Sequence, residues 1–233
     1  MLETIAFIPD GNRRYAKREN ISVEKSYLIG TKKAWSILEW LSRYPEIKNG
    51  IFYTFSTKNF NRPKEEQLIL MKLFESELKH ITSKEKTEFL QKAKLKVKFI
   101  GNSKLFSKKL QDLMKIVEES TAKNGFRTVY FAIGYDGQEE IVQAVKNFVN
   151  EVAAGKKQIS NLTIENFKKY LQVDLNPDLI IRTSKEQRLS GFLTYQSAYS
   201  ELLFIDKYWP EINEDDLKKA IDDYNNRDRR FGE

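Results

Sequence analysis

Short runs of apolar, β-branched and aromatic residues alternate along the chain with longer segments whose apolar residues recur at helical spacing. The runs that predict strands are Ile5–Ile8, Gly50–Ser56, Leu95–Phe99, Thr128–Ile133, Asp178–Thr183 and Glu201–Ile205. Neighbouring parallel strands need a long crossover connection, which is usually a helix, so strands that alternate with helices indicate a parallel sheet. We therefore expect an α/β fold: one domain over residues 1–233 with a mostly parallel central sheet of about six strands and helices on both faces.

Amphipathic helices are expected between these strands. The apolar spacing predicts helices over Val23–Tyr44, from Pro63 to about Ile81, around Leu110–Val117, around Ile141–Val149 and over Asn213–Asn226. Pro63 suits the first helical position, and Asn213 suits an N-cap.

Polar residues gather just after several of the predicted strands. The carboxyl ends of parallel strands share one edge of the sheet, where ligands bind. This edge is predicted to collect Asp10, Arg13, Arg14, Arg62, Arg182 and Arg188. Arginine pairs with phosphate oxygens better than lysine does, so the edge is expected to bind phosphate groups. Neither common glycine-rich nucleotide loop follows a strand, which argues against ATP or a dinucleotide as the carrier.

The first strand runs into the turn Asp10-Gly11-Asn12, and two arginines follow directly. Gly11 permits a backbone shape in which successive N–H groups converge on an anion. A carboxylate among such donors is explained most simply by a divalent cation that links it to a phosphate. For the turn taken alone, the simpler interpretation of a solvated Asp-Gly-Asn turn stays open.

Composition restricts the kind of metal site. The chain has no cysteine and one histidine, His80, which excludes a disulfide framework, a thiolate site and a multi-histidine site. A metal would therefore have oxygen ligands, as Mg²⁺ prefers. The net charge of +7 favours an anionic partner and leaves nucleic acid, an acidic membrane surface and a phosphorylated small molecule open. The lack of a long apolar run and of a leader-like N-terminus predicts a cytoplasmic protein.

A set of motifs extends along the whole chain: Asp10–Ala16, Phe55–Pro63, Pro177–Thr183, Arg188–Leu193, Gln196–Leu202, Trp209-Pro210 and Arg229–Gly232. In this order they resemble the motifs of the cis-prenyltransferases, the family typified by undecaprenyl diphosphate synthase. The resemblance implies repeated condensation of isopentenyl diphosphate onto farnesyl or geranylgeranyl diphosphate. The product would be a cis-polyprenyl diphosphate, a precursor of the glycosyl-carrier lipid.

The resemblance also implies roles for individual residues. Asp10 would support Mg²⁺ and the departing diphosphate, and Glu201 would help to place the metal. The allylic diphosphate would be held by Gly11, Asn12, Arg13, Arg14 and Arg62, and isopentenyl diphosphate by Arg182, Arg188 and Ser190. The same blocks contribute Tyr15, Ser56 and Phe60 to the substrate site. Arg230 and Gly232 would reach into the partner subunit's site, which implies a homodimer.

Two further needs follow from this chemistry. The growing hydrocarbon requires a dry tunnel, for which the candidate lining residues are Leu68, Met71, Leu78, Ile100 and Phe106. Ordinary core packing would give the same spacing. The proton lost at the end of each condensation needs only a weak acceptor, either the diphosphate or a polar residue such as Asn59.

Several positions depart from the family pattern. Thr4 and Tyr27 stand where many members have histidine, and Lys58 replaces a glutamate. Ser184-Lys185 replaces a glycine-containing pair, and Gly134–Gln138 departs from an Asn-Tyr-Gly-Gly-Arg pattern. Lys58 reverses a charge at the predicted edge, where it would either add a counter-charge for the diphosphate or alter efficiency. The key residues stay intact, so an active subunit is expected.

Two other functions stay open. A non-catalytic module would grip an anionic lipid or nucleic acid through the same arginines, and its binding to nucleic acid would weaken steeply with salt and not need Mg²⁺. A non-catalytic subunit of a heteromeric prenyltransferase would normally lack the Asp10 block. Substrate diphosphates are favoured over nucleic acid, and any membrane contact is expected to be peripheral.

Overall fold

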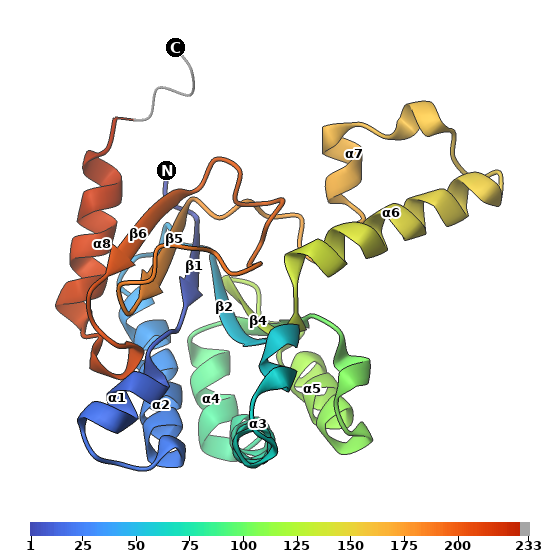
Figure 1. Ribbon diagram of the computed structural model, residues 1–233. Helices are drawn as coiled ribbons and strands as arrows, with labels where there is room; N and C mark the ends of the chain where they lie inside the picture. The colour runs from blue at the N-terminus through green and yellow to red at the C-terminus, as the bar shows by residue number, and fades with distance from the viewer. Residues whose placement is uncertain (229–233) are drawn as a thin grey trace.

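The strands of the molecule are β1 (Thr4–Ile8), β2 (Asn49–Ser56), β3 (Leu95–Ile100), β4 (Arg127–Tyr135), β5 (Leu179–Thr183) and β6 (Glu201–Ile205). The computed structural model, which describes residues 1–228, joins them in one six-stranded sheet of order β3-β4-β2-β1-β5-β6 (Figure 1). Each pair of neighbours in this sheet is parallel. The α/β fold class is thereby confirmed.

One or two helices follow each strand except β5, which a segment without an α-helix joins to β6. The helices are α1 (Asn12–Arg18), α2 (Val23–Leu41), α3 (Lys64–Ile81), α4 (Lys84–Lys92), α5 (Lys108–Thr121), α6 (Gly137–Ala153), α7 (Ile164–Lys168) and α8 (Glu214–Asn226). Short 3-10 turns cover Thr57–Asn61, Ser103–Leu105, Ile159–Asn161 and Trp209–Glu211. Asn213 caps α8 as predicted, because its Oδ1 accepts the Asp216 N–H at 3.0 Å.

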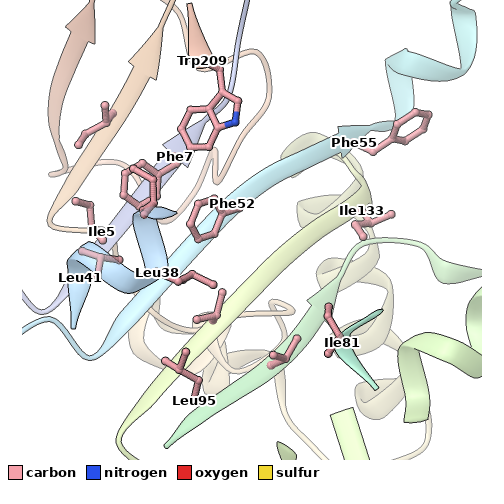
Figure 2. Packing of buried hydrophobic residues seen from close by; sticks show 14 of the residues in the cluster. Ile5, Phe7, Leu38, Leu41, Phe52, Phe55, Ile81, Leu95, Ile133 and Trp209 are labelled. Carbon is pink, nitrogen blue, oxygen red and sulfur yellow. The ribbon is translucent and has the colours of Figure 1, made fainter. Parts of the chain in front are cut away.

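One face of the sheet carries the main hydrophobic core. Side chains alternate between the two faces along β1, so Ile5 and Phe7 join this core while Ala6 and Ile8 face the other way. The core is completed by residues of α2, α3, α4, α5 and α8. Figure 2 shows Phe7 beside Phe52, whose rings stack with centroids 4.9 Å apart, and Trp209 edge-on to both.

The opposite face of the sheet is covered mainly by loops rather than by the expected layer of helices. Val173, Phe192 and Leu193 pack there against Ala6 and Ile180. Helix α6 extends away from the sheet and packs against α7 (Figure 1). The first face, with its layer of helices, is therefore the one that can enclose a cavity between helices and sheet.

The helix boundaries differ from expectation in three ways. Helix α2 ends at Leu41 rather than Tyr44, because Pro45 disfavours helical geometry at the residue before it. Pro63 is the N-cap of α3 rather than its first residue. Helices α1, α4 and α7 were not expected, since none is long enough to show apolar periodicity. No helix within residues 1–228 combines the length and the apolarity that crossing a membrane requires.

Candidate active site

A cavity of about 790 Å³ opens where β1, β2 and β5 end. Its polar lining includes Asp10, Gly11, Asn12, Arg13, Arg14, Ser56, Asn59, Arg62, Arg182 and Ser190. These residues are spread over most of the sequence, and the parallel sheet brings them together because the carboxyl ends of its strands share one edge. Most of the predicted site residues therefore lie on the wall of one cavity.

The carboxylate of Asp10 is held by cations and by its own turn. Its Oδ1 accepts the Gly11 N–H at 2.6 Å and lies 3.1 Å from Arg14 Nη2, and its Oδ2 lies 2.8 Å from Arg182 Nη2. Burial would raise the pKa of Asp10, but the hydrogen bond and charge of Arg182, with the charge of Arg14, hold it below its ordinary value. The side chain is therefore an anion at neutral pH.

The backbone around Asp10 is fixed by neighbouring loops. The Thr183 hydroxyl donates to Asp10 O at 2.7 Å, and the Trp209 N–H donates to the same oxygen at 2.9 Å. The Asp10 N–H donates to Thr183 Oγ1 at 2.9 Å. The ends of β1 and β5 and the loop after β6 are thus tied together directly behind the carboxylate.

Gly11 is required by this geometry. Its φ of +98° is in the left-handed region, and a Cβ at this position would lie 2.6 Å from Tyr208 Cδ1 and 2.8 Å from Ser184 Oγ. The tight turn aims the Gly11 N–H at Asp10, so a side chain here would displace the carboxylate.

Arg182 joins the carboxylate to the following loop. Its guanidinium is nearly buried, and Nη1 donates to Ser190 Oγ at 2.8 Å and to the Arg188 carbonyl. The Arg188 side chain points elsewhere: it is exposed and lies 2.5 Å from Glu186. Arg182 and Ser190 therefore form one unit at the edge of the cavity, while Arg188 lies outside its wall.

A second group of charges borders the cavity from α1, α2 and α3. Glu66 accepts a hydrogen bond from the Tyr27 hydroxyl at 2.7 Å and from Arg62 Nη1 at 3.0 Å. Arg13 Nε lies 3.6 Å from the other oxygen of the same carboxylate. The sequence interpretation gave Glu66 no role, although its i,i+4 spacing from Arg62 is a recognisable signal of pairing.

The inner part of the cavity is mostly apolar, and Glu77 of α3 accepts a hydrogen bond there from Trp35 Nε1 at 3.3 Å. Helix α3 contributes Leu70, Leu73, Phe74, Leu78 and Ile81, α2 contributes Val23, Ala34 and Leu38, and the sheet contributes Phe52, Phe99, Phe131 and Ile133. Of the predicted tunnel residues, Leu78 lines this wall. Leu68 is 60% exposed, Ile100 packs on the opposite face of the sheet, and Met71 and Phe106 belong to the surrounding core. These four residues do not line this cavity, and ordinary core packing, the alternative left open above, describes Ile100, Met71 and Phe106.

Other predicted residues lie away from the cavity. Glu201 is the first residue of β6, so it lies at the amino ends of the strands, whereas Asp10 follows the carboxyl end of β1. The Glu201 carboxylate lies 2.5 Å from Arg227 Nη1. Tyr15 lies beside Arg18, and Phe60 packs edge-on against Phe55. Within one chain these residues do not join Asp10. Arg230 and Gly232 lie outside the described residues.

Asp10 and Glu77 are the acidic residues among the described lining of the cavity, and Asp10, beside Arg14 and Arg182, is the one placed to bind a metal together with a diphosphate. Within residues 1–228 no group of three or more His, Cys, Asp or Glu residues is placed to hold an ion. A single carboxylate fits the way Mg²⁺ is commonly held, by one or two protein oxygens together with substrate phosphates and water.

A family model described as "Putative undecaprenyl diphosphate synthase" matches residues 8–232 of the chain. A curated relative from Thermoplasma acidophilum, "Tritrans,polycis-undecaprenyl-diphosphate synthase (geranylgeranyl-diphosphate specific)", is 41% identical over 230 residues, which cover 98% of this chain and 88% of the relative. An "Isoprenyl transferase" from Fusobacterium nucleatum is also 41% identical, over 98% of this chain and 94% of its own length.

The chain also resembles a protein of known structure. The crystal structure of lavandulyl diphosphate synthase from Lavandula x intermedia, in complex with dimethylallyl diphosphate, aligns with a TM-score of 0.89 at 29% identity. The alignment covers 99% of this chain and 98% of that one. The similarity therefore extends over the whole sheet and the elements that surround the cavity.

Proposed function

The chain belongs to the cis-prenyltransferase family and condenses isopentenyl diphosphate with an allylic diphosphate, and we propose that its allylic substrate is geranylgeranyl diphosphate. The support for this primer is the geranylgeranyl diphosphate specificity in the names of relatives from Thermoplasma acidophilum and Pyrococcus abyssi, which are about two-fifths identical over nearly the whole chain. The product is a cis-polyprenyl diphosphate.

The observation that carries the site assignment is the division of one cavity into a charged mouth and a mostly apolar interior. An allylic diphosphate has the same division, with a charged head and a long hydrocarbon. We assign the head to the region around Asp10, Arg14 and Arg62, and the hydrocarbon to the space between α2, α3 and the sheet. Isopentenyl diphosphate is assigned to Arg182 and Ser190.

In each condensation the C1–O bond of the allylic diphosphate breaks and its electron pair leaves with the diphosphate. The double bond of isopentenyl diphosphate then supplies the electrons for the new carbon–carbon bond at C1. Fixed positive charge near the departing oxygens stabilises the developing anion, which is the role we assign to Arg14 and Arg62. The apolar walls, with Phe52 and Phe74 among them, keep water from the allylic cation.

We assign the metal to Asp10. Mg²⁺ would supply Lewis-acid neutralisation of the diphosphate charge. The depressed pKa of Asp10 keeps its oxygens ionised and available to a hard cation, and Arg182 and Arg14 balance that charge until the ligands arrive.

The proton that leaves isopentenyl diphosphate goes to the departing diphosphate in this scheme. Asn59 lies on the cavity wall, and its Oδ1 already accepts the Ser56 N–H at 3.0 Å. The Nδ2 of the Asn59 amide is a hydrogen-bond donor, so Asn59 is suited to orient a phosphate oxygen rather than to accept a proton.

We also propose that the enzyme is a homodimer. Val142, Val145 and Val149 lie on one face of α6 and are 53%, 44% and 54% exposed, an apolar stripe that a second copy would cover. The Asp10 block makes a silent subunit of a heteromeric enzyme the less favoured alternative. A catalytic homodimer should elute at twice the chain mass and turn over without a second protein.

Incorporation of labelled isopentenyl diphosphate tests the proposed function. Purified protein with Mg²⁺ should convert the label into butanol-extractable product, with a higher kcat/KM for geranylgeranyl than for farnesyl diphosphate. Equal use of the two primers would refute the primer assignment alone. Failure to incorporate label with either primer would refute the activity.

A further inference from the structure

Glu66 is a buried acid at the border of the cavity. It lies in the first turn of α3 and is only 9% exposed. A carboxylate taken out of water loses hydration energy that only hydrogen bonds or opposite charges can replace. Here the replacement comes from three side chains on three different elements, and two of them are arginines that line the cavity.

The contacts around Glu66 form a closed network. Arg62 Nη1 donates both to Glu66 Oε1 at 3.0 Å and to the Tyr27 hydroxyl oxygen at 2.7 Å. The same hydroxyl donates to Glu66 Oε1 at 2.7 Å. Burial, with the Glu66 charge also contributing, raises the pKa of Tyr27, so the phenol remains a donor. Each bond restrains the position of the Arg62 guanidinium.

Arg13 is held from the other side of the carboxylate. Its Nε lies 3.6 Å from Glu66 Oε2, whereas Arg62 approaches Oε1. One acid thus stands between two cations that would otherwise repel each other. Two positive charges and one negative charge leave the group with a net charge of +1, still able to attract a diphosphate.

We propose that Glu66 is a positioning residue that orients Arg62 and Arg13 toward the diphosphate of the allylic substrate, with Tyr27 bracing Arg62 against it. The inference rests on the proposed function, because it assigns these arginines to the allylic head rather than to isopentenyl diphosphate. Removing the Glu66 charge should therefore weaken one substrate selectively.

A purely structural role for Glu66 makes a different prediction. An acid in the first turn of a helix stabilises that helix through its dipole, whatever it contacts. Glu65 occupies the same turn and is exposed, so it shares this effect without the arginine contacts. Glu65→Gln is therefore the matched control for Glu66→Gln.

Steady-state kinetics of the full-length enzyme separates the two roles. Glu66→Gln is expected to raise the KM for the allylic diphosphate about tenfold, the ratio that about 1.4 kcal/mol of lost binding would give. The KM for isopentenyl diphosphate should stay within about twofold of wild type. The kcat should fall, because Arg62 also stabilises the departing diphosphate. Tyr27→Phe should produce the same selective pattern with a smaller rise, and Glu65→Gln should change none of the three constants.

A binding measurement checks the inference without turnover. Titration with geranylgeranyl thiodiphosphate, an unreactive analogue, should show a dissociation constant about tenfold higher for Glu66→Gln than for wild type or Glu65→Gln. An unchanged allylic KM in a folded Glu66→Gln variant would overturn the proposal. A parallel rise in both KM values together with a lowered melting temperature would also overturn it, in favour of the structural role. Wild type that does not turn over would instead refute the proposed function, and this inference with it.

Discussion

Arg182 Nη2 lies 2.8 Å from Asp10 Oδ2, although the two residues are 172 positions apart in the sequence. The contact bridges the ends of β1 and β5, which are paired directly in the sheet. Through Ser190, the same guanidinium connects the acid to the loop that we assign to isopentenyl diphosphate. The residues assigned to the two substrates are therefore neighbours at one sheet edge.

Replacing Asp10 tests the charge at this edge. Asp10→Asn keeps the shape of the side chain and removes the anion, so kcat should fall by about 10²- to 10³-fold, as when a key electrostatic group is lost. Asp206→Asn serves as the control, because Asp206 is an exposed acid paired with Lys185. Normal turnover in folded Asp10→Asn would contradict the assigned role.

Gly11→Ala tests the turn that holds the acid. The new Cβ would meet Tyr208 and Ser184 at less than van der Waals distance, and φ is +98°. A residue forced into such a conformation costs about 1–3 kcal/mol, so the melting temperature should fall and kcat should fall with it. Gly125→Ala is the matched change, since a Cβ there has no heavy atom within 4 Å. Equal melting temperatures for the two variants would argue against the strain.

The apolar wall makes a prediction about product length. Leu78 lines the cavity and is 4% exposed, so Leu78→Trp should fill part of the space and shorten the polyprenyl product. Leu68→Trp places the same ring on the same helix at a position that is 60% exposed, and the product should keep its wild-type length. Chromatography of the dephosphorylated products compares the two. A change in product length with Leu68→Trp but not with Leu78→Trp would contradict the placement of the hydrocarbon in this cavity.

Alkaline pH should destabilise the loop that contains Ser190. The Tyr53 hydroxyl donates to Ser190 O at 3.2 Å, and burial raises the pKa of Tyr53 from 10.0 to about 12. Because the folded state binds this proton more tightly than the unfolded chain does, its contribution to stability is complete below about pH 10 and is lost as pH rises toward about 12.

Denaturant unfolding at several pH values measures this effect. The free energy of unfolding should decline less steeply across that window in Tyr53→Phe than in wild type, because the variant lacks the group that titrates. Tyr199→Phe is a suitable comparison, since Tyr199 is 79% exposed. Identical slopes for wild type and Tyr53→Phe would contradict the raised pKa.

Much of the sheet could be predicted because its signal is local. The runs at Ile5–Ile8 and Glu201–Ile205 are short, apolar and bounded by polar residues, and the alternation with helices implies parallel pairing. The edge where Asp10, Arg62 and Arg182 meet then follows from the rule for the carboxyl ends of parallel strands.

The cavity wall could not be predicted in the same way. Helix α3 has apolar residues on more than one side, and tertiary packing decides that Leu78 faces the cavity while Leu68 faces solvent. The contact between Glu66 and Arg13 is also non-local, since it depends on how α1 and α3 are placed. Glu201 was grouped with Asp10 by resemblance alone. The direction of β6 places Glu201 at the amino ends of the strands, whereas Asp10 lies at the carboxyl ends.

The most direct test of the central claim is a crystal structure of the protein with geranylgeranyl thiodiphosphate, isopentenyl diphosphate and Mg²⁺. We expect the allylic diphosphate beside Asp10, Arg14 and Arg62, the second diphosphate at Arg182 and Ser190, and the hydrocarbon between α2 and α3. Density for both diphosphates away from this sheet edge, with the cavity empty of hydrocarbon, would contradict the claim.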